Sequence, residues 1–144
     1  MNKIFLDADV VRDLYVQRQP HHNIALQLFT QLKRTKTKYY TSALVMANVY
    51  YILAKIANRQ FAMDKIRRLR KLVAIAPINE STVDAALSSP YKDFEDSIQF
   101  HCAVQNGLNT LITRNTRDYP KEQLRVTDPL QYLSVTKLEK EGFT

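Results

Sequence analysis

Four separated positions in this 144-residue sequence carry carboxylate or amide side chains, the oxygen ligands that hard metal ions prefer. The first is Asp7, which directly follows a short apolar segment, and the third is Asp96. The second position holds Asn48, and the fourth holds Asn115 with Asp118 close behind it. Carboxylates at the carboxyl ends of parallel strands can hold a divalent cation over a phosphate. These residues therefore predict metal-assisted hydrolysis of a phosphodiester.

The carboxylates differ in how well a purely structural role explains them. Asp96 stands one turn into an apolar helix pattern, where only a functional role explains it well, and Asp7 is the second firm candidate for a metal ligand. Three other acids are better explained without a metal. Asp93 is expected to be an N-cap, Glu95 a solvated residue in the first turn, and Asp9 a helix-start residue that faces solvent.

Two supporting residues, Ser42 and Thr113, and two further catalytic candidates, Asn115 and Asp118, keep two interpretations each. Ser42 and Thr113 either orient a carboxylate through their hydroxyl groups or serve only as a helix cap and a strand end. Asn115 either binds metal or fixes a turn, and Asp118 is either a neighbouring acid of the site or a plain turn residue. Asn48 brings an amide oxygen but no negative charge, so it should lower the metal affinity of the cluster.

The elements that must position these residues alternate between strands and helices. Short apolar or β-branched runs predict strands at residues 3–7, 38–41, 73–78, 110–113 and 124–126. Helical spacing predicts helices at 9–16, from 20 to beyond 32, 42–57, 61–72, 81–88 and 93–106, and a short closing helix from 128. This order is typical of an α/β fold. We expect a three-layer α/β/α sandwich with a central parallel sheet of four or five strands.

Helix ends and domain limits follow from local signals. Ser81 and Asp84 resemble a capping box, and Gly107 is placed to end a helix in the left-handed conformation. No linker or internal repeat interrupts the chain. We therefore expect one domain over residues 1–136, followed by a polar tail over residues 137–144.

The composition is that of a basic globular protein. The sequence has 21 Lys and Arg against 14 Asp and Glu, a formal net charge of +7, which favours polyanionic partners such as RNA. It has no apolar run near the ~20 residues that a membrane span needs and no signal-peptide pattern, so we expect a cytoplasmic protein without a membrane partner. A single Cys rules out an intramolecular disulfide.

The ordered set of motifs resembles the PIN domain, the fold of VapC-like toxin ribonucleases. The resemblance covers nearly the whole chain: the strand that ends in Asp7, the helix start Thr41-Ser-Ala-Leu-Val-Met-Ala-Asn48, the segment Asp93-Phe-Glu-Asp96, and Leu111-Ile-Thr-Arg-Asn115 followed by Asp118-Tyr119. No single motif is decisive, but their order and separations in a chain of this length are fairly specific.

The resemblance implies both a reaction and the residues that perform it. In that family an acid cluster binds Mg²⁺ or Mn²⁺ and cuts RNA. By position, Asp7 would be the first acid, Asp96 the third, and Asn115 the fourth, with Asp118 beside it. The second position is usually Glu, and Asn48 departs from that pattern. The resemblance further implies a small antitoxin protein as partner and a homodimer.

Two other functions remain open from the sequence. The first is a degenerate PIN-like domain that binds RNA or protein without cutting, which Asn48 favours. The second is a phosphatase of the haloacid-dehalogenase type, because Asp7-Ala8-Asp9 after an apolar strand resembles the start of that motif. The phosphatase needs a later Lys and a larger chain, so the metal-dependent endoribonuclease is the leading hypothesis.

Overall fold

The protein folds around one five-stranded parallel sheet. The computed structural model describes residues 2–89, 93–120 and 122–142. The elements in chain order are β1 (Lys3–Leu6), α1 (Ala8–Tyr15), α2 (His21–Arg34), β2 (Lys38–Thr41), α3 (Ala43–Ile56), α4 (Arg59–Leu72), β3 (Ala74–Ile75), α5 (Glu80–Ser88), α6 (Phe94–Gln105), β4 (Thr110–Ile112), the 3₁₀ turn η1 (Thr116–Asp118), β5 (Arg125–Thr127) and α7 (Pro129–Gly142).

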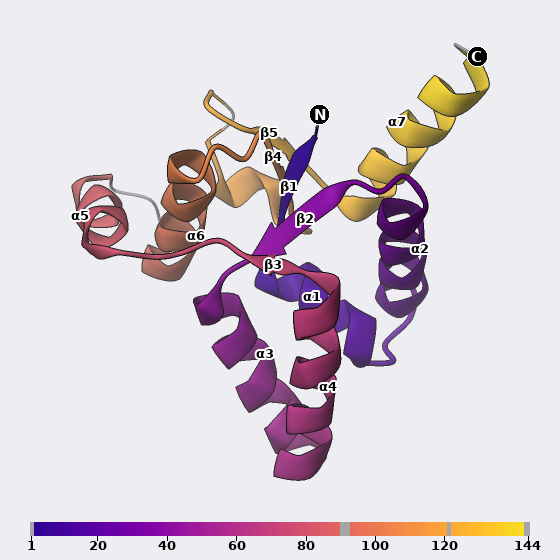
Figure 1. The fold of residues 1–144 in the computed structure, drawn as a ribbon, viewed down its shortest axis with the longest axis horizontal. Helices are drawn as coiled ribbons and strands as arrows, with labels where there is room; N and C mark the ends of the chain where they lie inside the picture. The colour runs from indigo at the N-terminus through magenta and orange to yellow at the C-terminus, as the bar shows by residue number, and fades with distance from the viewer. Residues whose placement is uncertain (1, 90–92, 121, 143–144) are drawn as a thin grey trace.

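The strands lie in the order β3-β2-β1-β4-β5, and every neighbouring pair is parallel. Helices α5 and α6 pack together on one side of the sheet and α2 and α7 on the other, while α3 and α4 form a long hairpin next to α1 (Figure 1). The expected α/β/α class and the parallel sheet are therefore confirmed, with five strands.

The central strand is buried on both faces because helices cover both. Ile4, Phe5 and Leu6 of β1 are fully buried, as are Leu111 and Ile112 of β4 beside it. A continuous apolar run of this kind is the usual signature of an inner parallel strand. The rigid β1–β4 pair therefore fixes the position of whatever side chains follow its two carboxyl ends.

Three local details differ from the sequence-based expectation. The capping box of α5 is formed by Asn79 and Thr82 rather than by Ser81 and Asp84, because the Asn79 side chain accepts the Thr82 N–H while the Thr82 hydroxyl oxygen accepts the Asn79 N–H. Strand β3 has only two residues. Helix α7 continues to Gly142, where a short helix and a polar tail were expected, since residues 130–141 contain no Gly or Pro to end it.

Other helix ends follow the prediction. Asp93 caps α6 by accepting the Asp96 N–H, and Gly107 adopts the left-handed conformation with φ of 71° just after α6. Among the described residues, no helix is both long enough and apolar enough to cross a lipid bilayer.

Candidate metal-binding site

The site begins where β1 and β4 end side by side. Leu6 pairs with Ile112 in the sheet register, and the Asp7 N–H donates to the Ile112 carbonyl at 3.0 Å. Asp7 and Thr113 therefore leave the sheet together, and the Thr113 hydroxyl donates to Asp7 Oδ2 at 2.9 Å. Of the two roles that the sequence left open for Thr113, the orientation of a carboxylate is the one its geometry fits. Asp7 also caps α1 through a bond from the Ala8 N–H to Oδ1 at 2.8 Å.

Helix α6 brings the second acid to this edge. The Tyr119 hydroxyl lies 2.8 Å from Asp7 Oδ2 and 3.1 Å from Asp96 Oδ1, so it bridges the carboxylates of two residues that are far apart in sequence. Burial, together with the charges of Asp7 and Asp96, raises the pKa of Tyr119 far above its usual value. The phenol therefore keeps its proton and acts as a hydrogen-bond donor between the two acids.

Asp9 also points into this site, contrary to the prediction that it faces solvent. Its Oδ2 accepts the Arg114 backbone N–H at 3.0 Å and lies 3.3 Å from the Thr113 hydroxyl. Its Oδ1 is buried and has no hydrogen-bond partner among the described residues. Asp9 lies in the first turn of α1, and the chain that leaves β4 places the Arg114 N–H where it holds this carboxylate inward.

The clustered acids perturb one another. Burial and the Asp7 charge raise the pKa of Asp9 to about 6. Burial, followed by the charges of Asp7 and Asp93, also raises the pKa of Asp96 to about 6. Glu95 has a raised pKa for the same reasons, burial first and then Asp93 and Asp7. Such mutual repulsion is a physical sign of a site that gains from a bound cation.

A cavity of about 420 Å³ opens over these acids. Its lining includes four acids and several amides: Asp7, Asp9, Asn48, Glu95, Asp96, Gln99 and Asn115, with Arg12 and Tyr51 among the rest. The structure thus brings the predicted residues Asp7, Asn48, Asp96 and Asn115 to one cavity. Glu95 is an exposed residue in the first turn of α6, as the sequence indicated, and it also borders this cavity.

The remaining predicted residues lie outside this lining. Asp118, in η1, is exposed and borders a separate surface depression, although its charge is near enough to raise the pKa of Asp96. Asp93 is the N-cap of α6. Ser42 caps α3 and donates its proton to Gln99 Oε1 at 2.8 Å, so it orients an amide and not a carboxylate.

The chemistry of the site fits a hard divalent cation. Asp9 Oδ1 is a buried carboxylate oxygen without a partner, and the raised pKa values of Asp9 and Asp96 mean that positive charge at the cavity would stabilise their ionised forms. As the described side chains lie, no three His, Cys, Asp or Glu residues form a complete metal-binding group. A cation here would therefore also use amide oxygens, which Asn48 and Asn115 supply.

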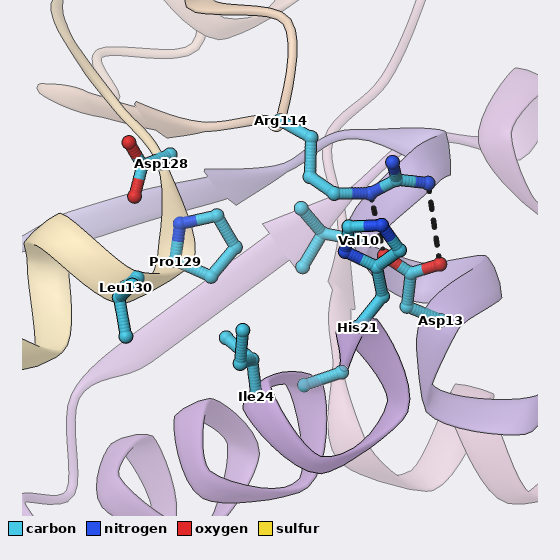
Figure 2. Close-up of a pocket in the computed structure, with 9 residues that line it drawn as sticks. Val10, Asp13, His21, Ile24, Arg114, Asp128, Pro129 and Leu130 are labelled. Atoms are coloured by element: carbon cyan, nitrogen blue, oxygen red, sulfur yellow. Dashed lines mark hydrogen bonds and ion pairs between the residues drawn. The ribbon is translucent and has the colours of Figure 1, made fainter. Parts of the chain in front are cut away.

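A second cavity, of about 260 Å³, is lined by residues of α1, α2 and α7 and by Arg114 (Figure 2). Its walls are mainly apolar and include Val10 and Ile24, together with Pro129 at the start of α7. The Arg114 guanidinium binds the buried Asp13 carboxylate there through Nε at 2.7 Å and Nη2 at 3.3 Å. Because the Arg114 backbone N–H holds Asp9, this ion pair anchors the segment that carries one wall of the acid cavity.

Comparison with known proteins agrees with this arrangement. The family model of the PIN domain matches residues 3–117. The chain belongs to the PIN domain family. The match includes the Asp7-Ala8-Asp9 motif that also suggested a phosphatase, so it assigns that motif to the PIN fold.

Similar proteins include a VapC ribonuclease and solved structures of VapC20 and FitAcB. Ribonuclease VapC1 from Aquifex aeolicus is 26 % identical over 122 residues, which cover 81 % of this chain and 84 % of that protein. The FitAcB structure from Neisseria gonorrhoeae has a TM-score of 0.67 at 20 % identity and covers 88 % of this chain and 98 % of its own. The structure of Mycobacterium tuberculosis VapC20 is described as that of a toxin that cleaves the sarcin-ricin loop. It has a TM-score of 0.59 at 19 % identity and covers 75 % of this chain and 86 % of its own.

Sequence reasoning missed three side chains of this PIN domain site. Tyr119 was noted only as part of a motif, although it directly follows the 115–118 segment. Gln99 lies three residues after Asp96, a spacing that places both on one helix face and could have pointed to it. Arg12, from α1, had no signal beyond its charge.

Proposed function

We propose that this PIN domain is a metal-dependent endoribonuclease of the VapC type. The observation that carries the proposal is the approach of Asp7 and Asp96, whose carboxylates contact the same Tyr119 hydroxyl at 2.8 and 3.1 Å. The name of the relative Ribonuclease VapC1 supports the reaction, and the net charge of +7 supports a polyanionic substrate.

Asp7 and Asp96 would hold Mg²⁺ or Mn²⁺, with Asp9 beside them and the amide oxygens of Asn48 and Asn115 completing the ligand set. When bound, such a cation would polarise the scissile phosphate and lower the pKa of the attacking water. Thr113 and Tyr119 hold the Asp7 carboxylate in one orientation. In this proposal Asp118 acts through its charge on Asp96 and not as a ligand.

The test is an RNA cleavage assay with purified protein in Mg²⁺ or Mn²⁺ and in EDTA. Cleavage should need the metal, and Asp96→Asn should reduce its rate at least about 100-fold. The loss of one preorganised hydrogen-bond donor in an active site typically costs about 2.7–4 kcal/mol of transition-state stabilisation, and the loss of a metal-binding charge should cost no less. Asp84→Asn, an exposed carboxylate on α5, is the matched control and should cleave like the wild type. Cleavage that persists in EDTA would contradict the proposal.

Asn48 supports one alternative, a PIN domain that binds RNA or protein without cutting. An amide at this position of the cavity supplies no charge to hold a cation. A non-cleaving domain of the RNA-binding kind should bind RNA equally well in EDTA and in Mg²⁺ and should show no cleavage products. The same assay therefore separates the two functions.

As partners we propose a small antitoxin protein and a second copy of this chain, in the cytoplasm. The VapBC-1 structure from nontypeable Haemophilus influenzae, with a TM-score of 0.67 at 15 % identity over 89 % of this chain, and the FitAcB structure support a toxin of a two-protein pair. Exposed apolar side chains on α3 and α4, Ile56 and Phe61, suit a protein contact. Light scattering of the purified protein should give the mass of a dimer, and a monomer mass would contradict the second proposal.

A further inference from the structure

A buried amide lies in the wall of the acid cavity. Gln99, in α6, is only 1 % exposed and lines the same cavity as Asp7 and Asp96. It follows Asp96 by three residues, so the two side chains lie on one face of the helix. Gln99 thus belongs to the site by position, although none of the roles proposed above uses it.

The orientation of this amide is determined by its neighbours. The Val45 N–H donates to Ser42 Oγ at 3.2 Å, and the Ser42 hydroxyl donates its single proton to Gln99 Oε1 at 2.8 Å. The amide oxygen therefore faces Ser42. Gln99 Nε2 is buried and meets no acceptor among the described residues.

A buried donor without an acceptor destabilises a fold, and most buried polar groups are paired. An apolar side chain of similar size at this position would avoid that cost. The unpaired Nε2 can therefore gain an acceptor from a ligand that enters the cavity. Arg12 points to the charge of that ligand, because it lines the same cavity and its guanidinium forms no ion pair with any described residue.

We propose that Gln99 is a catalytic residue that donates from Nε2 to a nonbridging oxygen of the RNA phosphate at the acid cavity. This inference rests on the ribonuclease function proposed above. A fixed donor stabilises the negative charge that develops on a phosphate oxygen, and it does so best in a partly buried site where water is excluded. Ser42 is then a positioning residue, since its hydroxyl holds Oε1 and leaves Nε2 as the amide group that can bind the substrate.

The first experiment compares two glutamines of the same helix. Gln99→Leu should lower the single-turnover cleavage rate about 100- to 1000-fold, as is usual when one preorganised donor is removed. Its melting temperature should stay close to that of the wild type, because the loss of the unpaired Nε2 donor is offset by the loss of the acceptor for the buried Ser42 hydroxyl. Gln105→Leu is the control: Gln105 Oε1 accepts the Thr82 hydroxyl proton at 2.8 Å, so this variant should melt earlier but cleave at the normal rate.

Two further measurements separate donation to the substrate from contact with the metal. The Mn²⁺ affinity of Gln99→Leu, measured by calorimetry, should equal that of the wild type, and a large loss would show that the amide oxygen serves the cation instead. Gln99→Glu keeps an acceptor for Ser42 but turns a carboxylate toward the cavity. It should bind Mn²⁺ more tightly and cleave RNA more slowly, and a normal cleavage rate would overturn the proposal.

Failure of this inference is distinct from failure of the ribonuclease function. If the wild type cleaves RNA and Gln99→Leu cleaves equally fast, only the role of Gln99 is wrong. If the wild type does not cleave, the deciding measurement is fluorescence anisotropy with a labelled single-stranded RNA of mixed sequence in Mg²⁺. Binding that is at least tenfold weaker in Gln99→Leu supports the contact, whereas equal binding, or no binding by the wild type, overturns it.

Discussion

At the scale of single residues, the Tyr119 hydroxyl links Asp7, which follows β1, to Asp96 in α6. It donates between Asp7 Oδ2 and Asp96 Oδ1, while its ring is buried in the core. A hydrogen-bond partner that orients metal-binding carboxylates typically raises metal affinity by a factor of about 10–100. The hydroxyl and the ring can be tested separately because Phe keeps the ring.

Tyr119→Phe is expected to weaken Mn²⁺ binding about tenfold, because Asp7 and Asp96 lose the donor that holds them together. Calorimetric titration of the metal measures this change. Tyr39→Phe, at a buried tyrosine of β2 that packs edge-on against Phe29, is the matched control and should leave the affinity unchanged. Equal affinity in Tyr119→Phe and the wild type would show that the hydroxyl does not orient the acids.

A substitution at Asn48 should strengthen metal binding. Asn48→Glu adds a carboxylate to a cavity that already holds Asp7 and Asp96, so Mn²⁺ affinity and any cleavage activity should both rise. Gln17→Glu adds the same charge at an exposed position outside this cavity and should change neither. If Asn48→Glu also changes neither quantity, another residue fills the second position of the cluster.

The raised pKa of Asp96 predicts how the metal-free protein responds to pH. Its pKa is about 6 in the folded protein against an ordinary value of 3.8, so folding opposes ionisation and stability falls as the pH rises from about 4 to about 6. Asp96→Asn removes this loss. In EDTA at pH 7 the variant should be more stable than the wild type by about 1–2 kcal/mol, allowing for solvent screening of a half-buried group.

Denaturant unfolding at pH 4 and pH 7 measures this difference. The two proteins should be closest in stability at pH 4, where Asp96 is largely protonated in the folded state. A wild type that is the more stable protein at pH 7 in EDTA would contradict the proposed repulsion among Asp7, Asp93 and Asp96.

At the scale of elements, the Asp13–Arg114 ion pair ties α1 to the segment after β4. Asp13 is 4 % exposed, and the pair is bidentate. Removing one partner of a buried pair leaves an uncompensated charge, so Asp13→Asn should lower the unfolding free energy by about 2–4 kcal/mol. The exposed pair Asp64–Arg68 is the control, and Asp64→Asn should cost at most about 0.5 kcal/mol.

Denaturant unfolding measures the change in unfolding free energy for Asp13→Asn and for Asp64→Asn. Asp13→Asn should also weaken Mn²⁺ binding, because Arg114 holds Asp9 through its backbone N–H. Equal losses of stability in the two variants would mean that the Asp13–Arg114 pair does not anchor this segment.

The elements themselves were largely predictable from the sequence. The apolar run before Asp7 and the β-branched run before Thr113 each specify a buried strand, and parallel pairing then places both residues at one edge. The inward turn of Asp9 was not predictable, since it depends on the path of the chain at Arg114. The role of Tyr119 depends in the same way on the η1 turn, whose conformation local sequence signals do not determine. The capping box of α5 was misplaced because Ser81 and Asn79 are both acceptable N-caps.

At the scale of the whole molecule, the net charge of +7 predicts binding to RNA that depends on salt. Each phosphate contact releases counterions, so affinity for single-stranded RNA should fall more than about tenfold between roughly 50 and 200 mM salt. Fluorescence anisotropy with the Asp96→Asn variant measures this without cleavage. An affinity that is independent of salt would contradict an electrostatic interface.

The central claim is that Asp7 and Asp96 share one divalent cation. The most direct test is a crystal structure of the protein soaked in Mn²⁺, with the metal located by its anomalous scattering. We predict one Mn²⁺ with a carboxylate oxygen of each residue at about 2.0–2.2 Å. A Mn²⁺ that contacts only one of these carboxylates, or none bound at this edge of the sheet, would contradict the account.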